Sequence, residues 1–377
     1  MTQRTPRRDF LLGHSDAARD VEAGGRSPGE TAAPGDEPYV VHLSRKAMAG
    51  EFEICLPAAI AGEATAAALE ALDLVQSLEG QLSFFKPDSD ISAINREAAE
   101  AAVKVEPRLF ALLQAAMRLW RESDGAYDLT AAPLWEVWGF ARRLGTIPSP
   151  EQLAEAQSLV GGQWVELDEE QETIRLLSRG MRLNLGSIGK GYAVDRAVEH
   201  LLAAGVSDFL VHGGYSSVAA RGWAAGPAAI DGPSDSAAAA RAARAARRPW
   251  KIGVKDPLRD ELRLGQVELR DRALGTSGAQ FQSFRHRGRR YGHILDPRTG
   301  QPADGVLSVT VLAPTATEAD ALSTAFYVMG PEAAMDYCQQ HPSIAALVFA
   351  QVGSRWELHH HGLAEESADL LTALAKH

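Results

Sequence analysis

A glycine-rich stretch from Asn184 to Asp195 has the composition of an anion-binding turn. It places three glycines and Lys190 where a helix is expected to begin. Glycines let the backbone approach a ligand, and the free N–H groups of a helix N-terminus suit phosphate or pyrophosphate. The spacing matches neither the P-loop nor the dinucleotide-binding fingerprint. A tight strand-to-helix turn with a solvated lysine is the alternative interpretation.

A histidine, His293, stands just before the turn 296–300, which reads Asp-Pro-Arg-Thr-Gly. The turn itself needs no function, because Pro fixes φ and Gly supplies a positive φ. A histidine at the end of a strand can act as a general acid or base, or can bind phosphate. The alternative is a histidine with a purely structural role.

Two oxygen-bearing side chains lie one helical turn apart, at Asp320 and Thr324. On a helix, residues i and i+4 share a face, so both oxygens would point the same way. A carboxylate and a hydroxyl suit a hard ion such as Mg²⁺ that also contacts phosphate oxygens. Asp320 could equally be an ordinary acid near a helix N-terminus, where the helix dipole favours it.

Aromatic residues follow the sequence Gly-Ala-Tyr-Asp-Leu-Thr at positions 125–130. They continue through Trp135, Trp138 and Phe140, and could form walls around a flat heterocycle or simply belong to the core. Taken together, the four segments predict phosphoryl transfer on a nucleotide-like cofactor, with Mg²⁺ neutralising charge on the leaving group.

The elements that must position these residues are of both kinds. Apolar residues at helical spacing predict helices, and β-rich runs bounded by turns predict strands and hairpins. The predicted helices cover residues 64–78, 108–122, a segment ending near 202, and 317–328, with another from 331; predicted strands include 39–43, 53–56, 164–167, 173–177, 209–212 and 250–254. Hairpins are too many for a plain parallel βαβ protein, so we expect an α+β fold.

Composition divides the chain into segments. Residues 1–37 are rich in Gly, Ser, Pro and acidic residues and are expected to form a disordered leader. Residues 38–360 form the expected main domain, and the Ala- and Arg-rich stretch 224–248 is a predicted flexible insertion within it. We expect a C-terminal helix at 361–377.

Charge and cysteine content exclude several classes of protein. Lys and Arg number 38 against 49 Asp and Glu, giving a net charge of −11, which argues against a nucleic-acid partner. The two cysteines, Cys55 and Cys338, form no disulfide framework or zinc motif in the sequence. No stretch is long and apolar enough to predict a membrane span. Arg7 and Arg8 resemble the start of a twin-arginine signal, but no apolar core follows, so we expect a cytoplasmic protein.

The motifs, in their order, resemble those of the ApbE family of FAD:protein FMN transferases. The similarity runs from about Ala47 to about Phe349, and six segments carry it: 83–95, 125–130 with 138–140, 186–195, 276–278, 293–300 and 319–324. The resemblance implies a T-fold-like body that holds FAD in a cleft, with a metal ion at the pyrophosphate. A Ser or Thr hydroxyl of an acceptor protein would attack the FMN-side phosphorus, and AMP would leave.

The resemblance also implies roles for individual residues. Asp320 and Thr324 match the family's metal ligands, with the Ser187 carbonyl as a third, and His293 matches its proposed proton-transfer histidine. Lys190 would take up phosphate charge beside Mg²⁺. The positions that match flavin contacts are Met48, Phe85, Ala126, Tyr127, Asp128, Asn184, Lys190 and Ile294.

Four positions depart from the family's pattern. Met48-Ala49-Gly50 stands where Met-Gly-Thr is common, and Phe85 replaces a frequent Tyr. Asn184 replaces a common Asp, and residues 213–217 replace a familiar Gly-Gly-Asp. Two other functions stay open at this point: an FAD pyrophosphatase that releases FMN and AMP, and a flavin-binding protein without turnover.

Overall fold

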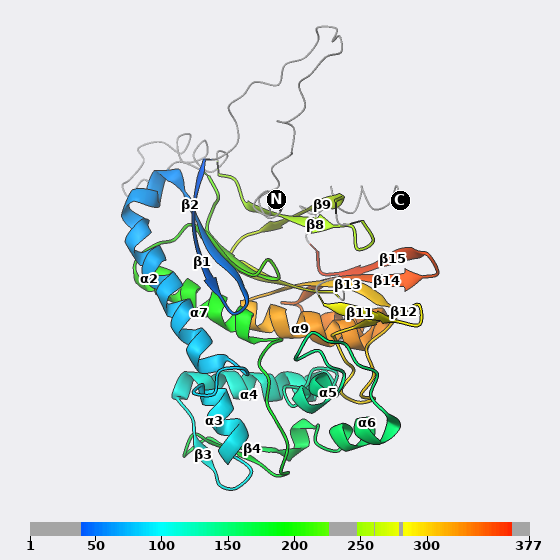
Figure 1. The fold of residues 1–377 in the computed structure, drawn as a ribbon. Coiled ribbons are helices and arrows are strands. Elements are labelled where there is room, and N and C mark those ends of the chain that lie inside the picture. The colour runs from blue at the N-terminus through cyan, green and yellow to red at the C-terminus, as the bar shows by residue number, and fades with distance from the viewer. Residues whose placement is uncertain (1–38, 226–246, 260, 279–281, 364–377) are drawn as a thin grey trace, which may run out of the picture.

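An eight-stranded antiparallel sheet organises this computed structural model, which describes residues 39–225, 247–259, 261–278 and 282–363 (Figure 1). The strand order is β1-β2-β6-β7-β10-β13-β14-β15. The strands are β1 (Val40–Ala47), β2 (Gly50–Pro57), β6 (Phe209–Gly213), β7 (Ser217–Arg221), β10 (Arg272–Gly278), β13 (Val306–Ala313), β14 (Ala345–Val352) and β15 (Arg355–His361).

Helices cover one face of this sheet and a two-stranded ribbon covers the other. Alternate residues of a strand face opposite sides, so Phe52 and Ile54 pack toward the helices while Cys55 faces the ribbon. Each side has its own buried apolar cluster. The helices are α2 (Ala58–Leu82), α7 (Gly189–Ala203), α9 (Ala316–Met329) and α10 (Pro331–Gln340), and the ribbon strands are β8 (Trp250–Lys255) and β9 (Arg263–Leu269).

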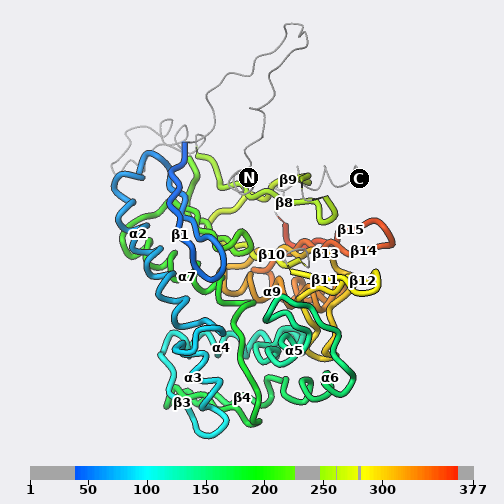
Figure 2. The backbone as a smooth tube through the Cα atoms, in the orientation of Figure 1, coloured from blue at the N-terminus to red at the C-terminus, as the bar shows by residue number. Residues whose placement is uncertain are grey.

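A second layer lies beneath α7 and α9 in Figure 1. The layer contains α3 (Asp90–Glu97), α4 (Pro107–Glu122), α5 (Ala132–Val137), α6 (Pro150–Gln157), the 3-10 turn η1 (Gly162–Trp164) and the small sheet of β3 (Val103–Lys104), β5 (Thr173–Leu176) and β4 (Val165–Asp168). The hairpin of β11 (Ser283–His286) and β12 (Arg289–Gly292) lies at the level of α9 in Figure 1, and its Phe284 packs against Phe140. The chain between β5 and α7 runs from the second layer to the sheet, as Figure 2 shows in green.

Local sequence explains where several helices begin. Helix α4 has Pro107 at its first position, and the Glu106 carboxylate accepts a hydrogen bond from the Leu109 N–H at 3.0 Å. Helix α6 begins with a full capping box formed by Ser149 and Gln152. Helix α7 has no side-chain cap at its N-cap residue, Ile188, and the Gly191 N–H of its first turn is bonded instead to Asp320 on α9.

The structure confirms the mixed α and β fold class. Strands β4 and β5 pair as the predicted hairpin, and α2 extends beyond the predicted 64–78, where glycines near both ends weaken the periodic signal. The expected leader at 1–37, nearly all of the insertion at 224–248 and most of the expected helix at 361–377 lie outside the described residues. His361 itself ends strand β15, so the boundary at 361 was wrong. None of the described helices combines the length and apolarity needed to cross a membrane.

Candidate functional site

A cavity of about 440 Å³ opens between the sheet layer and the second layer. Every residue that the sequence analysis assigned to the site contributes to its walls. They come from the β1–β2 turn, the loop after α2, the loop before α5, the loop into α7 and its first turn, the segment after β12, and α9. The topology therefore brings together residues separated by most of the described chain.

Helix α9 carries the two predicted oxygen ligands. Asp320 is 4% exposed, and its Oδ2 accepts a hydrogen bond from the Gly191 N–H at 3.0 Å. Thr324, one turn later, has its hydroxyl 3.2 Å from that of Ser277 on β10. Burial raises the pKa of Asp320, while Lys190 and the Gly191 amide act in the opposite direction.

Close backbone approaches fix α7 and β10 against α9. A Cβ added to Gly191 would lie 2.2 Å from the Ala316 carbonyl oxygen, and one added to Gly275 would lie 2.3 Å from that of Ala319. Only glycine fits at such distances. These contacts hold the uncapped start of α7, with Lys190, beside the Asp320 carboxylate.

A carboxylate on α7 caps the start of α9 and so helps to position Asp320 and Thr324. Asp195, on α7, accepts hydrogen bonds from the N–H groups of Ala316 at 2.8 Å and Thr317 at 2.7 Å. The Thr315 hydroxyl, at the cap position itself, accepts from Glu318 at 3.2 Å. The start of α9 is therefore held twice, once by its own cap and once by α7.

One ring nitrogen of His293 is hydrogen-bonded, and the surroundings of the ring favour its neutral form. Its Nδ1 lies 3.0 Å from the Gln282 carbonyl oxygen, which can only accept, so Nδ1 carries the proton. Burial lowers the pKa of His293, the Gln282 carbonyl opposes this, and the nearby Lys190 charge lowers it further. A neutral ring protonated on Nδ1 leaves Nε2 as a proton acceptor.

The aromatic walls differ in exposure. Phe85 is 65% exposed, and its ring centroid lies 6.1 Å from that of Trp135, so its ring surface is open to stacking. Tyr127 is 1% exposed. Burial raises the pKa of Tyr127, the Ser187 hydroxyl lowers it, and the Asp320 charge raises it again, so the Tyr127 hydroxyl stays protonated at neutral pH.

Two of the predicted flavin-contact residues also hold the cavity's loops. The Asp128 carboxylate accepts hydrogen bonds from the Thr130 N–H at 2.7 Å and the Gly162 N–H at 3.2 Å. The Asn184 side chain accepts from the Gly186 N–H at 2.8 Å. Asn184 thus shapes the turn into α7 without adding a negative charge beside Asp320.

Sequence reasoning missed Gln282 and gave Ser277 no role. Gln282 accepts from both the backbone N–H and the ring of His293, and its amide donates to the Phe140 carbonyl at 2.9 Å. No local sequence pattern predicts that a residue acts through its backbone carbonyl. Ser277 lay within a recognised segment, but its contact with Thr324 depends on the packing of α9 against β10.

Comparison with known proteins places this architecture in a family. The ApbE family pattern matches residues 48–348. The FAD:protein FMN transferase of Treponema pallidum is 34% identical over 294 residues, which is 76% of this chain and 78% of that protein. The FAD:protein FMN transferase of Haemophilus influenzae is 29% identical over 322 residues, 82% of this chain and 86% of that protein.

Solved structures of ApbE proteins are similar to this chain in fold. The ApbE protein of Thermotoga maritima superposes with a TM-score of 0.71 and 29% identity, covering 85% of this chain and 97% of that one. The flavinyl transferase ApbE of Pseudomonas stutzeri gives a TM-score of 0.69 and 28% identity, covering 86% and 95%. With the matched pattern spanning most of the chain, we conclude that this protein belongs to the ApbE family and is a transferase.

Proposed function

We propose that this protein transfers the FMN part of FAD to a Ser or Thr hydroxyl of an acceptor protein, in a Mg²⁺-dependent reaction that releases AMP. The observation that carries the proposal is the meeting, in one cavity, of Asp320 and Thr324 with Lys190 and His293. The names of the relatives from Treponema pallidum and Haemophilus influenzae support the choice of FAD as donor and a protein as acceptor.

The donor set of the cavity fits a hard cation. Asp320 supplies a buried carboxylate, Thr324 a hydroxyl and Ser187 a backbone carbonyl, and all of these are oxygens. No sulfur or imidazole belongs to this set. When bound there, Mg²⁺ would neutralise charge on the pyrophosphate.

The chain's own residues supply positioning and proton transfer. Lys190 places a positive charge at the α7 N-terminus, where phosphate oxygens are favoured. The acceptor oxygen bonds to the FMN-side phosphorus as the bond from that phosphorus to the bridging oxygen breaks. The hydroxyl proton passes to Nε2 of His293, and AMP leaves with the bridging oxygen.

The deciding experiment incubates the full chain with FAD, with or without Mg²⁺ and with or without an acceptor bearing a flavinylation motif. We expect AMP only when both Mg²⁺ and acceptor are present, and flavin fluorescence on the acceptor in a denaturing gel. AMP with free FMN regardless of acceptor would instead support an FAD pyrophosphatase. Tight FAD binding without AMP would support a flavin carrier.

The metal assignment has its own prediction. Asp320→Ala removes a buried carboxylate from the ligand set, so Mg²⁺-dependent AMP release should fall at least about a hundredfold. Circular dichroism and a urea titration check that the variant folds. Asp336→Ala, on α10 and outside the cavity, is the matched control and should keep full activity. Unchanged AMP release in Asp320→Ala would exclude this residue as a ligand.

A further inference from the structure

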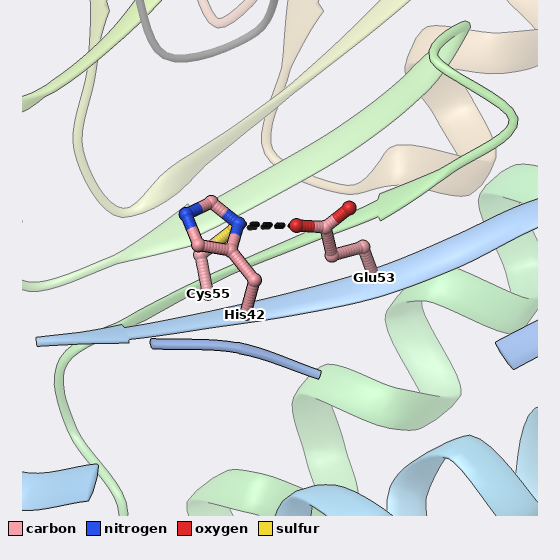
Figure 3. A group of neighbouring side chains, drawn as sticks. All are labelled: His42, Glu53 and Cys55. Carbon is pink, nitrogen blue, oxygen red and sulfur yellow. Dashed lines mark hydrogen bonds and ion pairs between the residues drawn. The ribbon is translucent and has the colours of Figure 1, made fainter. Parts of the chain in front are cut away.

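Three side chains of types that bind metal ions, His42, Glu53 and Cys55, lie together on the ribbon-facing side of the sheet (Figure 3). His42 on β1 sits directly across from Cys55 on β2, and Glu53 is two residues before Cys55 on the same face. Register and alternation therefore bring the three side chains together. None of the three lines the proposed FAD cavity.

The three ligand atoms are close enough to share one ion. The nitrogen Nδ1 of His42, an oxygen of Glu53 and the sulfur of Cys55 all lie within 4.8 Å of one another. Cys55 Sγ is 3.5 Å from His42 Nδ1 and 4.0 Å from Glu53 Oε1, and His42 Nδ1 is hydrogen-bonded to Glu53 Oε1. Among the described residues, no other trio of His, Cys, Asp and Glu side chains meets this spacing.

The carboxylate of this cluster is buried between two histidines. Glu53 is 2% exposed, and its Oε1 is hydrogen-bonded to Nδ1 of His42. Nε2 of His212, on β6, lies 3.5 Å from the second carboxylate oxygen of Glu53, within reach of an outer partner of a metal-bound carboxylate.

We propose that His42, Glu53 and Cys55 bind one Zn²⁺ ion. The set joins a nitrogen, an oxygen and a sulfur, a mixture that suits Zn²⁺ and does not suit Mg²⁺. In a tetrahedral zinc site, with Zn–S about 2.3 Å and Zn–N about 2.0 Å, sulfur and nitrogen stand about 3.5 Å apart. The Sγ–Nδ1 distance here is also 3.5 Å.

Zn²⁺ entry requires small local changes. Ion binding separates His42 from Glu53 and replaces their hydrogen bond. The Cys55 thiol gives its proton to solvent, and His42 carries its proton on Nε2 so that Nδ1 can donate its lone pair. The His42 side chain is 21% exposed, which leaves an approach for the ion and room for water as the fourth ligand.

The ion would join the edge strand β1 to β2. Among the strands that the structure describes, β1 has a neighbour on one side only, and the β1–β2 turn supplies Met48, Ala49 and Gly50 to the cavity wall. A zinc ion that bridges these strands therefore stabilises a hairpin that ends at the flavin site. This inference stands independently of the proposed reaction, since it uses no residue of that cavity.

Cobalt(II) gives the sharpest test, because a thiolate ligand produces an intense near-ultraviolet charge-transfer band that oxygen ligands do not. The purified full chain, stripped of metal by chelator, is titrated with Co²⁺. We expect the thiolate band to saturate at one ion per chain and to disappear when Zn²⁺ is added. Zn²⁺ should also raise the melting temperature by about 3–6 °C.

Matched variants separate this site from others. Cys55→Ser and His42→Ala should lose the thiolate band and the zinc-dependent melting shift. Cys338→Ser removes the chain's other thiol, which is buried in the opposite core cluster, and should keep both. Asp320→Ala, in the cavity, should also keep both.

If Cys55→Ser fails to fold, X-ray absorption of the zinc-loaded wild type still identifies the atoms bound to zinc. We expect one sulfur neighbour at about 2.3 Å, with the remaining ligands nitrogen or oxygen. A zinc shell without sulfur, a wild-type cobalt spectrum without the thiolate band, or a band that persists in folded Cys55→Ser would each overturn the proposal.

Discussion

At the scale of single residues, neighbouring groups determine the protonation state of His293 in the cavity. His293 is paired with a backbone carbonyl on Nδ1 and lies near the Lys190 charge, and both burial and that charge favour its neutral ring. A histidine in this state accepts a proton at neutral pH without first losing one. The proposed reaction needs such an acceptor beside the attacking hydroxyl.

Replacing this residue gives a prediction for both rate and pH dependence. His293→Gln should lower acceptor-dependent AMP release by about 10²- to 10⁴-fold and change FAD affinity only a few-fold. In the wild type, protonation of the ring removes the base, so the rate should fall as pH decreases through the lowered pKa, below pH 6.5. Stopped assays across pH 5–8 check this, and a wild-type acid limb retained in the variant would contradict the role.

At the scale of elements, α9 is positioned by a residue on α7. The Asp195 carboxylate accepts from two N–H groups of the first α9 turn, as described above. The same turn leads directly to Asp320 and then Thr324. A change at Asp195 should therefore affect stability and the proposed metal site together.

Two helix caps provide the test of that link. Asp195→Ala should reduce the free energy of unfolding by about 1–2 kcal/mol and weaken Mg²⁺ dependence, because α9 loses an anchor. Ser149→Ala removes the cap of α6, which lies outside the cavity, and should cost about 1 kcal/mol while activity is unchanged. Urea titrations and Mg²⁺ titrations of AMP release measure the two effects. Equal Mg²⁺ dependence in the two variants would show that the anchor does not reach the site.

The β1–β2 turn stores backbone strain at Ala49. Its φ is +58°, a left-handed conformation that costs an L-residue about 1 kcal/mol and a glycine almost nothing. Ala49→Gly should therefore raise the free energy of unfolding by about 0.5–1 kcal/mol. Ala66→Gly, on the exposed side of α2, should lower it by about 1 kcal/mol and serves as the opposite control. Urea unfolding measures whether each variant raises or lowers the free energy of unfolding.

Local sequence predicted the elements whose signals are local. Helix α4 was placed within one residue of its start by its proline and its apolar spacing, and the β4–β5 hairpin was predicted from its two strand-like runs, 164–167 and 173–177. The short helices α3, α5 and α6 were not predicted, because six to eight residues barely fill two helical turns. The cap from Asp195 reaches α9 from 121 residues away in the sequence. The Gln282 carbonyl and the His42–Glu53–Cys55 cluster have nearer partners, but they depend on strand pairing and register, which the sequence analysis did not predict.

At the scale of the whole molecule, a buried carboxylate in the central sheet ties stability to pH. Burial raises the pKa of Glu53, but hydrogen bonds and charge from His212 and His42 outweigh it and lower the pKa from its ordinary 4.5 to about 2. A lowered folded-state pKa means that ionised Glu53 stabilises the fold above pH 4.5, and that this stabilisation is lost as pH falls from 4.5 toward 2. The 2.5-unit difference corresponds to about 3 kcal/mol.

Comparing wild type with Glu53→Gln isolates this contribution from the other carboxylates. In chelator-treated protein, the wild type should exceed the variant in unfolding free energy near pH 6, and the difference should shrink by about 2 kcal/mol between pH 6 and pH 3. Urea titrations at pH 6, 4 and 3 follow the trend. A difference that stays constant over this range would mean that Glu53 is not the linked group.

The long separation along the chain between the cavity's walls has a consequence for biosynthesis. Met48 is made early and Thr324 late, yet both line the same cavity. A ribosome-bound chain that has reached only β13 already contains Lys190 and His293 but neither oxygen ligand of α9. Affinity for the nucleotide end of FAD should therefore arise in one late step of synthesis, and FAD added to a translation reaction should protect finished chains from proteolysis far better than stalled ones.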